Sequence, residues 1–150
     1  MREMISNTSC LIALTNIEML DLLRQVYGSV LVTNEVAAEF GEPLPGWVRV
    51  LPVQDMKALR ILQSSVDLGE ASTIALAMER GGEATMILDD LKARKLAQSL
   101  EMEFTGTIGV LIKAKQLGHD ISLEECIERF HSCGFRLSAD VEKTMRRADN

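Results

Sequence analysis

Apolar positions along the chain fall into short runs separated by longer stretches with helical spacing. The short runs predict strands at residues 4–6, 30–32, 47–53, 85–88 and 103–105. The stretches between and after them predict helices at residues 10–26, 35–40, 55–63, 69–79, 91–98, 107–116, 122–132 and 138–147. Strands that alternate with helices form right-handed βαβ units. The pattern therefore predicts an α/β fold with a mostly parallel sheet between helical layers.

Polar residues and proline refine these boundaries. Asn16 is a possible break in the first helix, Thr33 or Asn34 can cap the helix at 35–40, and Asp67 can cap the helix at 69–79. Thr8 and Ser9 can cap the first helix in the same way. Pro52 lacks a backbone donor, so the run at 47–53 is predicted at an edge or an end of the sheet.

The stretch ATMILDDLKARKLAQ, residues 84–98, organises the rest of the chain. It predicts a buried strand, then the adjacent acids Asp89 and Asp90, then a basic helix with an apolar stripe formed by Leu91, Leu96 and Leu100. The acids thus lie at the carboxyl end of a strand, the edge where open α/β sheets bind ligands.

Other polar side chains are predicted at the same edge. Asn7 follows the first strand, Glu35 and Glu39 follow the second, and Glu70 lies in a helix start. Mg²⁺ and Mn²⁺ prefer hard oxygen ligands, and such ions activate water for attack on a phosphodiester. Acids that converge on one sheet edge therefore predict a divalent metal site.

Each acid also has a simpler explanation. Asp89 and Asp90 can cap a helix, and Glu70 lies where a capping-box partner of Asp67 would lie. Glu35 and Glu39 are four residues apart on one helix face, and solvent is their commoner environment. The joint pattern, more than any single position, favours the metal site.

Three further groups are weaker candidates. Cys126, His131 and Cys133 lack a zinc-site spacing and a fourth ligand, so Cys126 is interpreted as a core residue. The Thr-Gly-Thr turn at 105–107 resembles a phosphate-binding turn, but a plain tight turn is favoured. The basic residues of the 91–98 helix can face phosphate, although such runs are usually solvated; they are Lys92, Arg94 and Lys95.

Composition and charge narrow the function. The 150 residues suit one domain, and no apolar run approaches the roughly 20 residues of a membrane span. Three scattered cysteines and an N-terminus that reads as a strand, not a signal peptide, indicate a reducing compartment, by default the cytoplasm. The net charge of −6 comes from residues 1–103, which argues against a passive DNA-coating protein but not against a metal-dependent enzyme.

The motifs SNTSCLIAL, VTNEVAAEF, LGEASTIALA, ATMILDDLKARKLA, TGTIGVLIKAK and CGFRLSADVEKTMRRA, in this order, resemble the PIN-domain superfamily. They are most similar to a branch of short prokaryotic proteins described as predicted nucleic-acid-binding proteins containing a PIN domain. The resemblance implies a three-layer α/β/α sandwich with four to five strands. It also implies a single domain over residues 1–150, with a C-terminal helical extension from about residue 119.

The resemblance further implies Mg²⁺- or Mn²⁺-dependent cleavage of single-stranded RNA, often by toxins that form homodimers and bind a small antitoxin. Its four acidic positions match Asn7 (in place of the usual Asp), Glu39, Glu70 and Asp90, with Asp89 as a neighbour and Thr8 as the hydroxyl residue. A neutral Asn7 is expected to lower metal affinity. Two alternatives therefore stand beside the enzyme: a non-catalytic nucleic-acid-binding module, and an interaction protein for an antitoxin-like partner.

Overall fold

A five-stranded parallel sheet forms the centre of the molecule. The computed structural model describes residues 2–149, and its strands lie in the order β3-β2-β1-β4-β5 with every pairing parallel. In chain order they are β1 (Glu3–Ser6), β2 (Val30–Thr33), β3 (Val48–Leu51), β4 (Ala84–Ile87) and β5 (Phe104–Thr105). The predicted α/β class and parallel sheet are confirmed, and β3 is an edge strand as Pro52 indicated.

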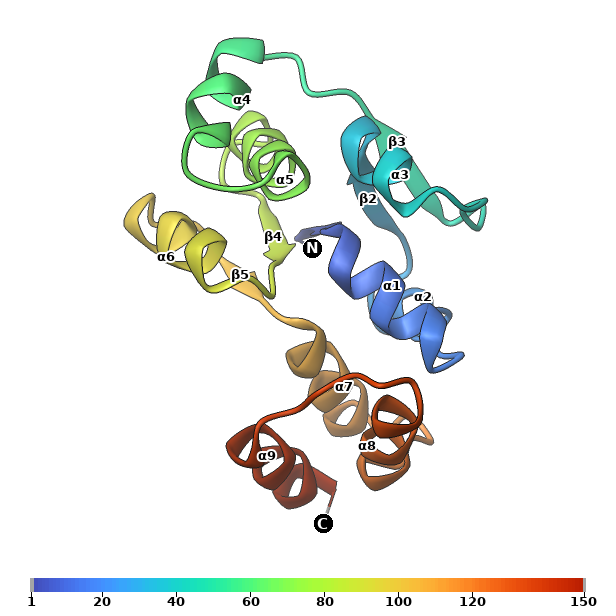
Figure 1. The fold of residues 1–150 in the computed structure, drawn as a ribbon. Coiled ribbons are helices and arrows are strands. Elements are labelled where there is room, and N and C mark those ends of the chain that lie inside the picture. Colours follow the sequence, from blue (N-terminus) through green and yellow to red (C-terminus); the bar gives the residue numbers. More distant parts are fainter. Residues whose placement is uncertain (1, 150) are drawn as a thin grey trace.

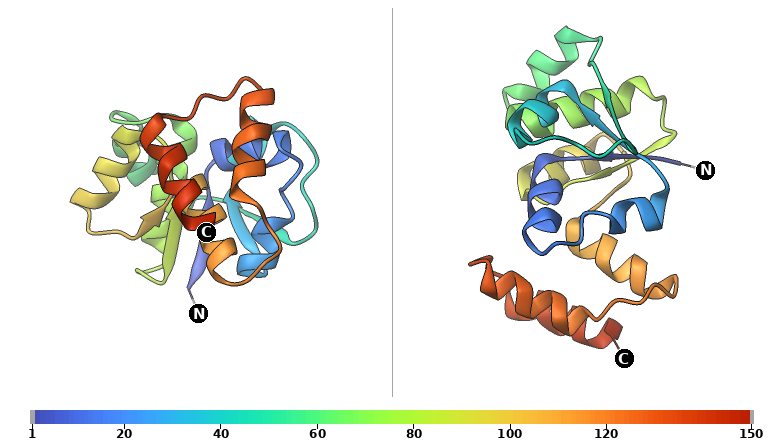
Figure 2. Two further views of the ribbon diagram at one scale, coloured as in Figure 1. Left: turned by 90° about the horizontal axis from the view of Figure 1, so that it is seen from below. Right: turned by 90° about the vertical axis from the view of Figure 1, so that its right-hand side faces the viewer.

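Helices cover both faces of this sheet (Figure 1). One face carries α4 (Met56–Gln63), α5 (Leu68–Glu79) and α6 (Leu91–Ser99). The other carries α1 (Thr8–Asn16), α2 (Leu22–Tyr27), α3 (Asn34–Phe40) and α7 (Thr107–Gln116). The last two helices, α8 (Leu123–Ser132) and α9 (Ala139–Asp149), pack beside α7, at the end of the molecule away from α4 (Figure 2). No helix within residues 2–149 is long and apolar enough to cross a membrane.

The period of two along each strand divides the core into two layers. On β1, Met4 packs with the helices of the α1 face, whereas the next residue, Ile5, packs with the α5 face. Leu31 of β2 and Met86 of β4 are the register partners of Ile5 and face the same way. The three-layer arrangement follows directly from this alternation.

The apolar faces of the C-terminal helices are buried against other parts of the chain. Their inward side chains are buried or half-buried in the core layer around α1 and α7, namely Leu123, Ile127, Phe130, Leu137, Val141 and Met145. The carboxylate of Asp149 accepts a hydrogen bond from the Leu123 amide at 2.9 Å and pairs with Lys115 at 3.2 Å. These apolar residues therefore provide no separate argument for a second copy of the chain.

Several predicted boundaries change. The first helix does end at Asn16, but its cap is Asn7, not Thr8 or Ser9, because the Asn7 Oδ1 accepts from the Cys10 amide at 3.0 Å. Thr33, not Asn34, caps α3. Asp67 precedes α5 without a side-chain capping bond, so its carboxylate stays free.

The apolar stripe predicted on α6 is wrong at two of its three leucines, since only Leu96 packs against the core. Leu91 is 65% exposed and Leu100 is 42% exposed, whereas Ala93 and Ala97 are fully buried against the sheet. Leu91 lies on the opposite side of the helix from the Ala93–Ala97 face, and Leu100 lies beyond the helix end. Small side chains on the inner face let α6 pack close to its neighbours.

Candidate functional site

The carboxyl edge of the sheet brings three separate segments together around Gly69. A Cβ atom on this buried glycine would lie 2.8 Å from Oε1 of Glu39 and 3.4 Å from Oγ1 of Thr8. Thr33 ties α3, which carries Glu39, to α5, which carries Gly69, since its hydroxyl caps α3 and lies 2.7 Å from the Ser72 hydroxyl of α5. Glu39, Thr8 and the start of α5 therefore share one corner of the edge.

Glu70 lies in the first turn of α5, where the negative charges of other acids act on its carboxyl group. Partial burial raises the pKa of its carboxyl group, and the negative charges of Asp67, Asp90 and Glu39 raise it further, in that order. A carboxyl group with this environment resists ionisation until a cation compensates the charge. The structure thus brings together Glu39, Glu70 and Asp90, and adds Asp67, which sequence reasoning assigned only to a cap.

Basic side chains within residues 2–149 do not neutralise these acids. The ion pairs near the sheet lie at its opposite, amino edge, where Arg80 binds Glu3 at 2.8 Å and Arg2 binds Glu103 at 3.0 Å. The hydrogen bond from Arg80 lowers the pKa of Glu3, the reverse of the shift at Glu70. In the described part of the chain, the acids at the amino edge are therefore paired with arginines, whereas those at the carboxyl edge are not.

The two adjacent acids after β4 have different tasks. Asp89 accepts from the Thr107 amide at 2.8 Å and from the Thr107 hydroxyl at 2.7 Å, so both of its oxygens hold the start of α7. Asp90 uses only Oδ2, which accepts from the Ala93 amide at 3.1 Å. Asp90 therefore keeps one oxygen available, whereas Asp89 serves mainly to join β4 to α7.

Asn7 and Thr8 carry buried polar atoms without partners. Asn7 is fully buried, and because Oδ1 accepts from the Cys10 amide, its Nδ2 group is left without a hydrogen bond in the described residues. Thr8 Oγ1 and Glu35 Oε1 are likewise buried and unpaired there. An amide nitrogen does not bind a cation, so Asn7 in this orientation is a weaker ligand candidate than the sequence suggested.

A hollow of about 620 Å³ opens beside the acids. It lies between the turn before α5 and the start of α6, and its lining comprises Gln63, Ser64, Ser65, Val66, Asp67, Asp90, Leu91 and Lys92. Its walls combine two carboxylates with the Lys92 ammonium group and with amide, hydroxyl and apolar groups. A polar ligand bound here would lie directly against Asp90.

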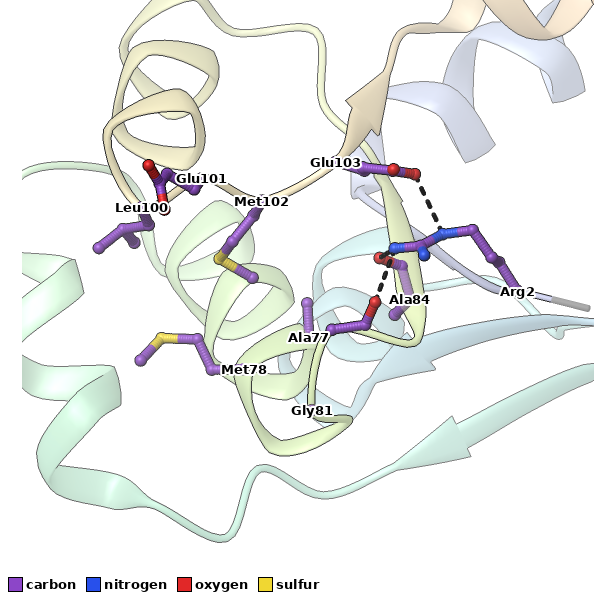
Figure 3. Close-up of a pocket in the computed structure, with 10 residues that line it drawn as sticks. Arg2, Ala77, Met78, Gly81, Ala84, Leu100, Glu101, Met102 and Glu103 are labelled. Atoms are coloured by element: carbon purple, nitrogen blue, oxygen red, sulfur yellow. Dashed lines mark hydrogen bonds and ion pairs between the residues drawn. The ribbon is translucent and has the colours of Figure 1, made fainter.

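A second hollow, of about 480 Å³, lies at the amino edge (Figure 3). Its polar wall comprises Arg2, Glu101 and Glu103. Arg2 donates to the Gly82 carbonyl at 2.8 Å and the Ala84 carbonyl at 2.9 Å, and it pairs with Glu103 at 3.0 Å. Met78 and Met102 form much of the rest. Because Arg2 and Glu103 already pair with each other, this hollow is a poorer candidate for chemistry than the carboxyl edge.

The donor chemistry at the carboxyl edge fits Mg²⁺ or Mn²⁺, with one restriction. Among residues 2–149, no three His, Cys, Asp or Glu side chains converge tightly enough to hold an ion alone. Mg²⁺ commonly binds through one or two carboxylates together with water and substrate phosphate. Glu39, Glu70 and the free oxygen of Asp90 suit a site of that kind, which the substrate would complete.

The cysteines near the C-terminus have separate partners. Cys126 is 1% exposed and its sulfur lies 3.5 Å from the Met19 sulfur, whereas Cys133 contacts the Asn16 carbonyl at 3.2 Å. His131 lies 3.3 Å from Glu142. The interpretation of Cys126 as a core residue is confirmed.

Sequence reasoning missed the packing roles of Gly69 and Gly106, and for Arg94 it favoured a solvated position over a phosphate contact. Gly69 and Gly106 leave room for the side chains of Glu39 and Arg94, respectively. Arg94 is not a solvated residue, because its Nε donates to the Leu88 carbonyl at 2.7 Å. The signals in the sequence were the glycines themselves, since each directly follows or precedes a polar site residue.

Comparison with protein-family models matches residues 3–150 to a family described as a PIN domain. Neither the comparison with curated proteins nor that with solved structures gave a match.

Proposed function

The chain belongs to the PIN-domain superfamily, a nuclease-like class of nucleic-acid-binding domain, and from this premise we propose that it is a Mg²⁺- or Mn²⁺-dependent endoribonuclease. The observation that carries the proposal is the grouping of acids at the carboxyl edge, where Oε1 of Glu39 packs against the start of α5 and the charges of Asp67, Asp90 and Glu39 act on the half-buried Glu70. No basic side chain in residues 2–149 pairs with Glu39, Glu70 or Asp90. Such an edge favours a divalent cation.

Each residue has a role in this proposal. Glu39, Glu70 and Asp90 would hold the ion, Asp89 fixes the start of α7 beside them, and Thr8 would orient water through its unpaired hydroxyl. When bound, the metal would activate water and stabilise the leaving oxygen of a phosphodiester. Asn7 would assist only through Oδ1, the oxygen that also caps α1.

The resemblance to the PIN-domain superfamily extends the proposal to the location, substrate and partners of the protein. We place the protein as a single domain over residues 1–150, in the cytoplasm, with single-stranded RNA as substrate. A role as the toxin of a toxin–antitoxin pair, a homodimeric state and a small antitoxin-like partner belong to the same proposal and rest on the resemblance alone.

A thermal shift experiment tests metal binding. A ligand at 100 times its dissociation constant adds about 2.7 kcal/mol to stability, and each kcal/mol shifts Tm by roughly 2–4 °C for a domain of this size. We expect Mn²⁺ to raise the Tm of the wild type by several degrees. Asp90→Asn should abolish most of that increase.

Asp55→Asn is the matched control. Asp55 also caps a helix, since its Oδ1 accepts from the Ala58 amide at 3.0 Å, but it lies at α4, away from the acids near Glu70. Both variants should lose comparable capping energy, and only Asp90→Asn should lose the Mn²⁺ response. Equal responses in both variants, or none in the wild type, would contradict the metal site.

A second candidate function is a non-catalytic nucleic-acid-binding module. The observation that favours it is Asn7, whose oxygen caps α1 and whose position lacks the charge of the usual Asp. An interaction protein for an antitoxin-like partner is the third candidate. Binding of single-stranded RNA without Mn²⁺-dependent cleavage would favour the module, and absence of both would favour the interaction protein.

A further inference from the structure

Two contacts anchor Arg94 of α6 at the carboxyl edge of the sheet. Its Nε donates to the Leu88 carbonyl, the residue that follows β4, at 2.7 Å. Its guanidinium carbon lies 5.4 Å from the centroid of the Phe104 ring on β5, a cation–π contact. The side chain is half-buried, and the two anchors fix the plane of its guanidinium group.

The terminal nitrogens of Arg94 point toward the start of α7. A Cβ atom on Gly106 would collide with Nη2 of Arg94 and would lie 3.0 Å from Oδ1 of Asp89. Asp89 nonetheless spends both oxygens on Thr107. Within the part of the chain that the structure describes, the Nη groups have no hydrogen-bond or ion-pair partner. A cation is therefore held beside the acids without neutralising any of them.

We infer that Arg94 binds a phosphate of the RNA strand next to the one that is cleaved, an inference that rests on the proposed function. An RNA strand that approaches Glu39, Glu70 and Asp90 meets like charge, so a fixed positive group beside them is needed to hold it. The planar guanidinium fork matches two phosphate oxygens, and Lys cannot reproduce that geometry. Because Leu88 and Phe104 already restrict the side chain, binding costs little further conformational entropy.

Gly106 is part of the same arrangement. Its φ of −124° and ψ of 177° are open to any residue, so the backbone does not require glycine here. The available space does require glycine, because a methyl group at this position would displace the Arg94 guanidinium. Gly106→Ala therefore moves the Nη groups while leaving the charge of the protein unchanged.

The test is fluorescence anisotropy with a fluorescein-labelled oligouridylate in EDTA, across a salt series, so that no cleavage occurs. Each phosphate contact to a single strand contributes about 0.7 to the slope of log Kd against log salt. Arg94→Gln should reduce that slope by about 0.7 and weaken binding on the order of tenfold at low salt. Arg94→Lys should recover the slope but not the full affinity, and Gly106→Ala should weaken binding with Arg94 intact.

Lys143→Gln is the control of equal charge change. Lys143 is exposed on α9, remote from the acids, and its loss should leave the slope unchanged. Circular dichroism must show each variant folded at the assay temperature. If Arg94→Gln and Lys143→Gln bind alike, or Arg94→Lys equals the wild type, the inference is overturned while the proposed function stands. If the wild type itself fails to bind the oligouridylate in EDTA, the inference is likewise overturned, and the Mn²⁺ thermal shift tests the proposed function separately.

Discussion

Replacement of Gly69 by alanine should perturb the candidate site while leaving the fold intact. Gly69 is buried near the start of α5, and the new Cβ would lie 2.8 Å from Oε1 of Glu39 and 3.4 Å from Oγ1 of Thr8. The first distance is too short for a nonbonded contact, so Glu39 must move. The second is an ordinary van der Waals contact and leaves Thr8 in place.

The expected change in stability is small. Alanine is preferred over glycine in a helix by up to about 1 kcal/mol, and it reduces the freedom of the unfolded chain. The carboxylate of Glu39 is the exposed end of a flexible side chain, and moving it off its rotamer costs about 0.5–1.5 kcal/mol. These opposing effects nearly cancel, so Tm should shift by no more than roughly 2–4 °C in either direction.

Metal binding should respond in the opposite direction. We expect the increase in Tm on Mn²⁺ addition to shrink in Gly69→Ala, because the Glu39 oxygen no longer occupies the corner beside Thr8. Gly46→Ala is the control, since a Cβ at Gly46 would meet no atom within 4 Å. An undiminished Mn²⁺ response in Gly69→Ala would refute the assignment of Glu39 to the metal site.

Three further predictions follow from the same edge. The raised pKa of Glu70 means that the charged form of its carboxyl group is penalised in the folded state. Glu70→Gln should therefore gain stability over the wild type as the pH rises above 4.5, the ordinary pKa of a Glu side chain. Thermal melts of both proteins at pH 3 and pH 7 measure this difference. Asp89→Asn keeps one acceptor for Thr107 but loses the charge, so the free energy of unfolding in urea should fall by about 1–3 kcal/mol. An unchanged free energy of unfolding would show that the start of α7 does not depend on Asp89. Asn7→Asp should raise Mn²⁺-dependent cleavage of single-stranded RNA, because Oδ1 still caps α1 and a carboxylate oxygen replaces the unpaired Nδ2; unchanged cleavage would count against a role of position 7 in the site.

The order of strands and helices could be predicted from the sequence because burial sets it locally. The runs around Ile5, Leu31 and Met86 are apolar on both faces, as a sheet covered on both sides requires. The packing of α6 could not be predicted so simply. Hydrophobicity favoured Leu91 for the inner face, but close contact between layers selected Ala93 instead.

The contacts at the candidate site could not be predicted from the sequence, although the location of some of its residues could. The end of a strand places Asp90 at the carboxyl edge, since parallel strands present their carboxyl ends together, and a helix start places Glu70 there. The division of labour between Asp89 and Asp90 depends on Thr107, which lies 18 residues further along the chain. Local sequence carries no signal for such a contact. The anchoring of Arg94 by Leu88 and Phe104 is hidden for the same reason.

The two locations of Asn7 matter for evolution, because this residue caps α1 and also lies at the carboxyl edge of the sheet. Helix capping favours only Asn, Asp, Ser, Thr and Gly at such a position. Asp is the one charged member of that set, and its codons differ from those of Asn by a single nucleotide. Descendants of this chain can therefore gain or lose a formal charge here in one mutational step without losing the helix cap, so the charge of this edge is free to drift while the scaffold persists.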